Sequence, residues 1–443
     1  MYVSESRGST PAVTAPSARG LFPGRTAVGA TVLALGAVSL VTDISSEMVT
    51  AVLPLYLVTG LGLSPLGFGL LDGVYNGFSA LVRLVGGHLA DRGGRHKPVA
   101  VLGYGLSALC KPLLLAVHTL PLIGAVLAVD RTGKGLRTAP RDAMISLASP
   151  PETRGRAFGV HRAMDTTGAL LGPLAAFLIL RQAAEGYDAV FTVSFCVAAL
   201  GVVVLLLFVP SHSSVTAGGV GPAAGSASSA GSRATGASGS ERPSLRAALG
   251  LLGRRELRGL TLCAVALGLA TVSDSFVYLL LQRRLGVPDR WFALLPLGTA
   301  AAFLLLAVPL GRWADRAGRW RVFVGGHLAL LAAYGLLLSH LRAGVLAYVV
   351  LALHGTFYAA TDGVLMAAAA GSVPAALRSS GLALVQTGQA TARFVCSIAF
   401  GAAWTAFGDR SALGGATVAL ALSVVVSLRL RPAAAETERG ADG

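Results

Sequence analysis

Twelve stretches of the chain are predominantly apolar over the length that a membrane-spanning helix needs, which is about 20 residues. Only 13% of the 443 residues are charged, against roughly 25% in soluble proteins. An apolar run in lipid must satisfy its backbone hydrogen bonds internally, so each run is expected to be a helix. We therefore predict an all-α membrane protein with twelve transmembrane helices, near residues 28–58, 66–89, 98–117, 121–147, 156–181, 188–209, 257–281, 290–312, 321–340, 343–370, 379–403 and 411–429.

The polar segments divide the chain into two halves of six helices, residues 27–209 and 257–430. Residues 1–26 and 431–443 are predicted to be tails, the first of them disordered because it is rich in Ser, Thr, Pro and Ala. Residues 210–256 form a linker rich in Gly, Ala and Ser, whose last part has the leucine and arginine spacing of a helix on the membrane surface.

The basic residues indicate how the helices are oriented. The linker and the loops after the second, fourth, eighth and tenth apolar runs carry Lys and Arg, whereas the loops after the first and third carry none. This asymmetry predicts that both termini are cytoplasmic, in the inner or plasma membrane of the cell. One loop departs from it, because Arg283, Arg284 and Arg290 fall on the other side. The net charge of +15 therefore indicates contact with membrane lipids, with no nucleic acid as a partner.

Several classes of site are not indicated. The four cysteines lie inside apolar runs without paired spacing, which indicates neither a disulfide framework nor a metal site. A membrane-embedded enzyme needs a catalytic set or a nucleotide-binding loop, and the sequence contains no such motif. We expect no enzyme activity, no cofactor and no bound metal.

The two halves repeat one another. The segment GGHLADRGGRHK at 86–97 returns as PLGRWADRAGRWR at 309–321. LVTDIS around Asp43 is echoed by TVSDSF around Asp274, and APRDAM around Asp142 by AATDGV around Asp362. The three matched segments recur at similar separations along the sequence. This regularity indicates duplication of a six-helix unit and hence two pseudo-symmetric halves. The residues that match in the first repeat are Gly87, Asp91, Arg92, Gly94 and Arg95 with Gly311, Asp315, Arg316, Gly318 and Arg319.

The charged stretch VDRTGKGLRTAPRD, residues 129–142, lies between two apolar segments. It is not a phosphate-binding loop, because the glycine that should precede Gly133 by five residues is missing. On a helix, its charged side chains form two neighbouring stripes. Arg131 and Lys134 fall near the middle of the membrane, where a lone charge costs about 2.5–3.5 kcal/mol or more, so they must pair or line a wet cavity. We expect Arg137 and Arg141 nearer the cytoplasm, and Asp130, Asp43 and Glu47 as partners of Arg131.

These features resemble the major facilitator superfamily of secondary transporters. The loop at Gly87, Asp91, Arg92, Gly94 and Arg95 matches the family pattern between the second and third helices. Arg131 and Gly135 match the pattern on the fourth helix. A third pattern, on the fifth helix, is typical of exporters that work by antiport and is matched by Gly168, Gly172 and Pro173.

The resemblance implies roles for these residues. Asp91 and Arg95 are expected to form a charge latch with Asp142 at the cytoplasmic end of the fourth helix, and the duplicated loop adds Asp315, Arg316, Arg319 and Asp362 to this gating set. The first, fourth, seventh and tenth helices are expected to line one central cavity. We expect proton coupling at this cavity to involve Asp43, Glu47, Asp130, Arg131, Lys134, His161, Asp165 and Asp274.

The sequence therefore predicts a monomeric secondary transporter that exports a small organic molecule in exchange for protons, by alternating access. A desolvated carboxylate can carry the proton, and a neighbouring arginine can modulate its affinity. The first alternative is export of a metal or another inorganic cation, for which the acids and His161 offer ligands. The many Lys and Arg residues argue against that alternative, and the membrane enzyme is the alternative from another class.

Overall fold

The computed structural model of the chain describes residues 29–91, 96–150, 153–183, 186–210, 253–341, 344–371, 373 and 378–430. Within these ranges every regular element is helical. The predicted tails and most of the linker lie outside the described residues. The first half consists of α1 (Ala30–Leu55) with the π-helical turn η1 (Tyr56–Gly60), α2 (Pro65–Asp91), α3 (His96–Ala116), α4 (Leu120–Leu147), α5 (Arg154–Gln182) and α6 (Tyr187–Phe208).

The second half follows the same plan, with two of its spans interrupted. It consists of α8 (Arg255–Leu269) and α9 (Asp274–Leu285), α10 (Asp289–Phe292) and α11 (Leu295–Ala317), α12 (Arg319–Leu338), α13 (Val345–Gly371), α14 (Arg378–Phe407) and α15 (Asp409–Leu430). Each half therefore contributes six spans. Ten of the twelve, all but α2 and α4, are long and apolar enough to cross a membrane within the described residues.

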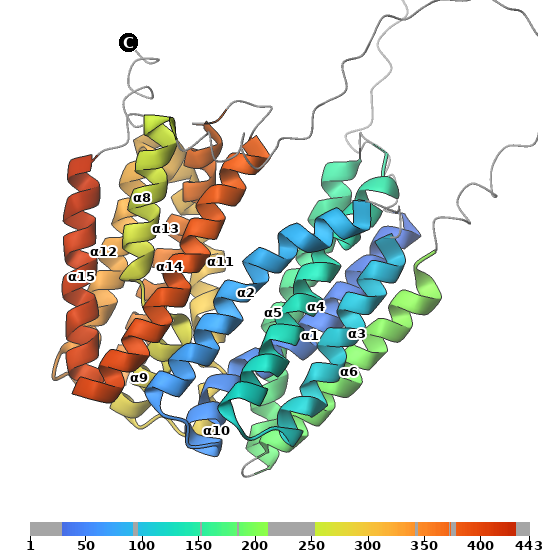
Figure 1. Cartoon of the computed structure of the whole chain (residues 1–443), viewed down its shortest axis with the longest axis horizontal. Coiled ribbons are helices and arrows are strands. Elements are labelled where there is room, and N and C mark those ends of the chain that lie inside the picture. Colours follow the sequence, from blue (N-terminus) through green and yellow to red (C-terminus); the bar gives the residue numbers. More distant parts are fainter. Residues whose placement is uncertain are drawn as a thin grey trace, which may run out of the picture.

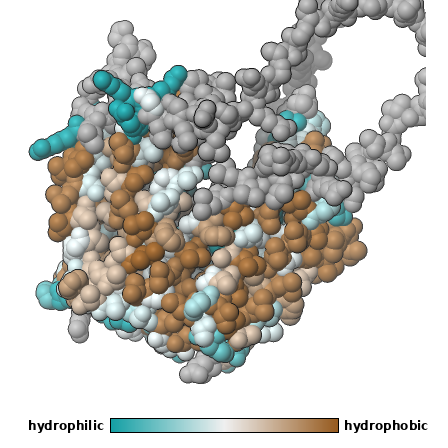
Figure 2. All heavy atoms as spheres, viewed as in Figure 1, coloured by the Kyte–Doolittle hydropathy of each residue, from teal (hydrophilic) through white to brown (hydrophobic). Residues whose placement is uncertain are grey.

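Packing confirms the duplication of the six-helix unit. In the first half α1 packs against α5 and α6, α4 against α2 and α3, and α3 against α6. The second half repeats these pairs with α8 against α14 and α15, α13 against α11 and α12, and α12 against α15. Large apolar side chains of both halves, among them Leu207 and Leu305, are exposed. On the face seen in Figure 2, hydrophobic residues cover the middle and hydrophilic residues gather toward the two ends.

The two halves meet at one end of the molecule. We call the end where α6 stops and α8 starts the linker end, and the opposite one the far end (Figure 1). The long contact between halves is that of α2 with α14. At the far end Phe68 meets Phe276 with ring centroids 4.9 Å apart, and Phe177 meets Trp291 at 5.0 Å. Aromatic contacts of this geometry stabilise the closed far end.

Toward the linker end the halves diverge (Figure 1). One hydrophobic cluster runs through the second half and takes in first-half residues near the far end, such as Phe68 and Phe191. A second cluster, around Val32, Tyr104, Met144 and Leu205, belongs to the first half alone. Among the described residues, the first half therefore joins the shared apolar core through its far-end part.

Glycines allow the close packing of α5 on α1. A Cβ atom at Gly168 would lie 2.4 Å from the carbonyl oxygen of Leu40, and one at Gly172 would lie 2.7 Å from the Cβ of Glu47. Such distances cannot be reached by any side chain, because backbone atoms would have to move. The glycines of the predicted antiport pattern thus set the distance between two helices that carry acidic residues.

We predict that Gly168→Val lowers the thermal stability of the purified protein in detergent, because overpacking a close helix contact costs about 1–3 kcal/mol or more. The matched control is Gly159→Val on the same helix, where an added Cβ meets nothing within 4 Å. Equal melting temperatures of the two variants would contradict the packing role of Gly168.

Candidate functional site

A central cavity of about 410 Å³ lies between the two halves. This volume is in the range of sites that bind small organic molecules. Helices α1, α2 and α5 of the first half line it, together with α9, α11, α13 and α14 of the second half and the segment between α8 and α9. Its charged lining residues are Glu47, Asp274, Asp362 and Arg393.

The seventh span is broken where it borders this cavity. Residues 270–273 between α8 and α9 are not helical, and Thr271, Val272 and Ser273 line the cavity. The backbone N–H of Val272 donates to the hydroxyl of Tyr334 at 2.8 Å, and the Cys396 thiol donates to the carbonyl of Thr271 at 3.2 Å. A break of this kind is stable in a membrane only where the protein satisfies the freed backbone groups or water reaches them.

Asp274 opens α9 directly after this break, with its side chain 42% exposed. The hydroxyl of Tyr358 donates to its Oδ1, and Nε2 of the fully buried His354 lies 3.4 Å from the same oxygen. Arg393 lies over the Tyr358 ring at 5.9 Å. The cavity wall of the second half thus presents the accessible carboxylate of Asp274, which accepts a hydrogen bond from the Tyr358 phenol and lies close to the His354 imidazole.

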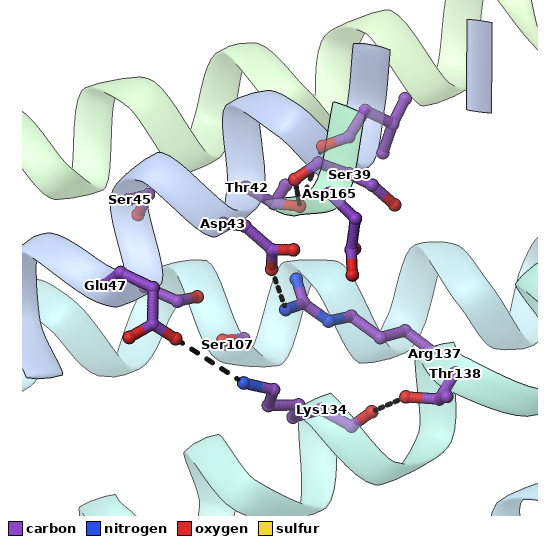
Figure 3. Close-up of polar contacts among 12 residues, drawn as sticks. Ser39, Thr42, Asp43, Ser45, Glu47, Ser107, Lys134, Arg137, Thr138 and Asp165 are labelled. Atoms are coloured by element: carbon purple, nitrogen blue, oxygen red, sulfur yellow. Dashed lines mark hydrogen bonds and ion pairs between the residues drawn. The ribbon is translucent and has the colours of Figure 1, made fainter. Parts of the chain in front are cut away.

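In the first half, α4 pairs its basic residues with acids on α1. Arg137 Nη2 lies 3.3 Å from Asp43 Oδ1, and Lys134 Nζ lies 3.9 Å from Glu47 Oε1. Figure 3 shows both pairs side by side between the two helices. Glu47 also lines the central cavity. Because Glu47 lies one helical turn from Asp43 on α1, the ion pairs reach the edge of the cavity.

Asp165 on α5 completes this cluster. Its carboxyl group lies beside that of Asp43 (Figure 3). Arg141 Nη1 lies 3.4 Å from Asp165 Oδ1, and its Nε donates to Asp142 at 3.1 Å. Two adjoining carboxylates repel each other unless a proton or a cation lies between them. Arg137 and Arg141 reduce that repulsion, and a proton bound between the two carboxylates would reduce it further.

Arg137 and Arg141 on α4 have partners that the sequence did not predict. They lie nearer the linker end of α4 than Arg131 and Lys134, and they pair with Asp43 and Asp165 among α1, α4 and α5. The rise per residue fixes the depth of a side chain but not which helix it faces. His161 is also buried in this region, where its Nε2 lies 2.9 Å from the hydroxyl of Ser39.

Arg131 and Asp130 form a separate buried cluster behind the cavity wall. Arg131 donates to Asp130 Oδ2 through Nε at 3.0 Å and Nη2 at 2.5 Å. Ser107 donates to Asp130 Oδ1 at 2.6 Å, and Lys111 Nζ lies 3.9 Å from that oxygen. The guanidinium stacks on Tyr75, 3.8 Å from the ring centroid.

This cluster corrects the expected partners of Arg131. Asp130 does pair with it, but Asp43 and Glu47 pair with Arg137 and Lys134 instead. Sequence reasoning also missed the phenols, because Tyr75 and Tyr358 lie within apolar runs as ordinary packing residues would. The one available signal for Tyr358 was its spacing of four residues from His354, which places both on one helix face.

The gating set is only partly described. Arg92, Gly94 and Arg95 lie outside the described residues, Gly87 lies within α2, and Asp91 is the last residue of α2. The latch of Asp91 and Arg95 with Asp142 therefore stays a prediction.

The second copy of the loop is described. Gly318 has φ of 96°, a backbone conformation that favours glycine, between α11 and α12. Arg319 Nη2 lies 3.4 Å from Asp315, and Arg316 is exposed. Asp362 differs from its repeat partner Asp142 in its surroundings, because it lines the central cavity.

Comparison with known sequences finds relatives over part of the chain. An uncharacterized MFS-type transporter of Methanocaldococcus jannaschii is 36% identical over 189 residues, which are 41% of this chain and 46% of that protein. An uncharacterized protein of Mycobacterium tuberculosis is 35% identical over 143 residues, 32% of this chain and 35% of that protein. The chain thus aligns with less than half the length of these curated relatives.

Solved structures share the whole architecture. The nucleoside transporter NupG superposes with a TM-score of 0.72 at 13% identity, covering 90% of this chain and 98% of that one. A bacterial homolog of the human lysosomal transporter Spinster, inward-facing and occupied, superposes with a TM-score of 0.68 at 16% identity, covering 90% and 96%. Such identities show a common fold alone. The family profile described as Major Facilitator Superfamily matches residues 35–394.

Proposed function

The chain belongs to the Major Facilitator Superfamily, and we propose that it exports a small organic molecule in exchange for protons. The observation that carries this proposal is the central cavity, which lies between two halves that meet at the far end and is lined by Glu47, Asp274 and Asp362. Rocking of the halves would close the linker end and open the far end around the same site.

The cavity favours a solute with a positively charged group. Three carboxylates and one guanidinium line it, together with the rings of Tyr75, Tyr278, Tyr358 and Phe303. A cationic nitrogen can bind the accessible carboxylate of Asp274, while an apolar body packs against the rings. The guanidinium of Arg393 can bind a carboxylate on the same solute. Zwitterionic solutes are therefore included in the test.

The proton is proposed to bind at the adjoining carboxyl groups of Asp43 and Asp165. Glu47 connects this pair to the substrate cavity, because it lies one helical turn from Asp43 and pairs with Lys134. A positively charged solute at the cavity and a proton at the pair would then compete for the same negative charge. Such competition is the basis of antiport, because each cation leaves the site as the other arrives.

We propose further that the linker end faces the cytoplasm, that the membrane is the cell's inner or plasma membrane, and that the protein acts as a monomer in contact with lipid. The basic loops support this orientation. A linker that only tethers the halves is consistent with its Gly, Ala and Ser content.

Export of an inorganic cation is less favoured by the site. Arg137 pairs with Asp43, and Lys134 pairs with Glu47, the first-half acid that lines the cavity. A metal ion would have to displace them and meet their charge at short range.

The proposal can be tested by transport into inverted membrane vesicles whose interior has been acidified. A panel of cationic, zwitterionic, neutral and anionic solutes would be added while uptake and interior pH are followed. We expect cations to accumulate and the interior pH to rise with each addition. Uptake without a pH change would exclude antiport, and accumulation of anions alone would exclude the proposed substrate class.

In the same assay we predict that Asp274→Asn weakens the uptake of cationic solutes about tenfold or more. The amide keeps the shape and a hydrogen bond to Tyr358 but loses the charge, and a hydrogen bond to a charged group contributes about 1.5–3 kcal/mol. Asp188→Asn is the matched control, because Asp188 is exposed in the first turn of α6, outside the cavity lining. A KM for the cation unchanged by Asp274→Asn would remove Asp274 from the binding site.

A further inference from the structure

Asp72 is a buried acid in the contact between the two halves, outside the lining of the central cavity. It lies on α2, where that helix packs along α14. The hydroxyl of Ser397 on α14 donates to its Oδ2 at 2.6 Å, and the side-chain amide of Asn76 donates to its Oδ1 at 3.2 Å. The hydroxyls of Ser273 and Ser275 at the start of α9 lie beside the same carboxyl group. Asp72 thus joins the first half to two helices of the second.

Small residues bring the backbones of α2 and α14 into direct contact around this acid. A Cβ atom added at Gly69 would lie 2.4 Å from the carbonyl oxygen of Ser397. One added at Gly401 would lie 2.5 Å from the carbonyl oxygen of Pro65. Helices in a membrane approach this closely only through small residues, and no layer of water separates them. Asp72 is therefore enclosed by protein while the far end is closed.

The partners of Asp72 are neutral. Among the residues that the structure describes, no ion pair includes it. An enclosed carboxyl group without a cation is unfavourable in its ionised form. Its neutral form can keep the same contacts, because the hydroxyl of Ser397 accepts hydrogen bonds as well as donating them. The closed contact between the halves therefore suits a protonated Asp72.

Other charged and titratable groups on the surrounding helices have partners of their own. Arg131 donates to Asp130, and Arg393 lies over the ring of Tyr358. The groups around Asp72 are Glu47 on α1, Tyr75 on α2, Lys111 on α3, Asp130 and Arg131 on α4, Asp274 on α9, and Arg393 and Cys396 on α14.

A small cavity beside Asp72 adjoins the central cavity. Its volume of about 20 Å³ is enough for one water molecule. Tyr75 and Ser275 line both cavities, so a proton has a short path between Asp72 and the central cavity. On the opposite side, Phe68 lies one helical turn from Asp72 and meets Phe276 of the other half. Water from the far end reaches Asp72 only after these two rings separate.

We propose that Asp72 is a proton-controlled latch between the halves, which closes the far end when it binds a proton and releases it when it is ionised. A proton that binds more tightly in the closed state shifts the population toward that state. The ionised carboxylate favours the open state, in which water surrounds it. The latch goes beyond the proposed function, because it acts for any solute and for either direction of transport. A permanent structural contact is the simpler explanation, and it predicts that closure does not depend on pH.

The experiment measures the separation of the halves at the far end of the full-length protein in lipid nanodiscs, by double electron–electron resonance. Spin labels are attached to Gln182→Cys on α5 and Arg290→Cys on α10, which are exposed on helices that meet across the halves. The exposed Cys196 is replaced by serine. We expect the longer distance to gain population as the pH is raised from about 5 to about 9, a range in which buried carboxyl groups of proteins titrate. One proton changes the ratio of closed to open protein by up to about tenfold for each pH unit.

A distance distribution that does not change with pH would overturn the latch. Closure at alkaline pH on replacing choline with Na⁺ would overturn the proton as its ligand, because the carboxylate would then hold a metal cation.

Asp72→Asn tests the sensing group, because the amide keeps the volume and the hydrogen bonds without the charge. The far end should stay closed throughout the pH range. Asp188→Asn is the matched control, since Asp188 is exposed on α6 and its loss should leave the native response. A native response in Asp72→Asn would exclude Asp72 as the sensor.

Ser397→Ala provides a second test, which does not require Asp72 to be replaced. It removes the contact on α14 that favours the closed state, so the far end should open at a lower pH than in the native protein. An unchanged midpoint would contradict a latch between Asp72 and α14.

Discussion

Asp43→Asn is expected to abolish proton-driven export while leaving exchange of solute across the membrane. An asparagine cannot take up or release a proton, yet it keeps nearly the same volume beside Asp165. Uphill accumulation in inverted vesicles should fall at least tenfold, as expected when the charged member of a proton relay is neutralised. Counterflow of labelled against unlabelled solute should continue, because it needs no proton movement.

The variant also leaves Arg137 without its carboxylate, and Arg137 is buried. Loss of folded protein could therefore imitate loss of coupling. The double variant Asp43→Asn, Arg137→Gln removes both charges and should recover the melting temperature but not the uphill accumulation. Proton-coupled accumulation at the normal rate in Asp43→Asn would exclude Asp43 as the proton site.

The sequence predicts the fold well because its strongest signals are local or repeated. An apolar run of sufficient length has only one stable form in lipid, so hydropathy predicts the twelve spans. The repeat of Asp91 and Arg92 as Asp315 and Arg316 predicts two similar halves, and matching helix pairs confirm them. Neither signal depends on how one helix faces another.

Pairing between helices is where prediction from the sequence failed. The helical spacing places Arg131, Lys134 and Arg137 correctly on α4, but α1 and α5 decide which acid each base meets. Those two helices come together through Gly168 and Gly172, which bring Asp165 beside Asp43. A single sequence indicates how deep in the membrane a residue lies. It does not indicate how the neighbouring helix is rotated, and therefore which side chains that residue meets.

The sequence repeat likewise does not predict the surroundings of each repeated residue. Asp142 and Asp362 occupy equivalent places in the repeat, but Asp142 pairs with Arg141 whereas Asp362 faces the central cavity. In the equivalent stretch of the second half, His354 and Tyr358 take the positions of basic and hydroxyl residues on α4. The first half therefore concentrates ion pairs, and the second exposes carboxylates to the cavity.

Arg131→Ala is expected to produce the largest loss of folded protein among the substitutions considered. Asp130 is buried and would keep only Ser107 and the more distant Lys111 as partners. Breaking a buried ion pair by removing one side costs about 3–5 kcal/mol, a large part of the stability of a protein. We expect little monodisperse protein after purification and a much lower melting temperature, while Arg181→Ala at the exposed end of α5 should be close to the native protein.

Arg131→Lys should be damaged nearly as much, because a lysine has neither the planar fork that donates twice to Asp130 nor the flat face that stacks on Tyr75. The double variant Asp130→Asn, Arg131→Gln tests the cause, since it leaves no buried charge unpaired. Recovery of folded double variant without proton-coupled export would give Arg131 a part in coupling as well as in folding. Recovery of both would restrict Arg131 to structure, because the Asp43 and Asp165 pair would then exchange protons without it.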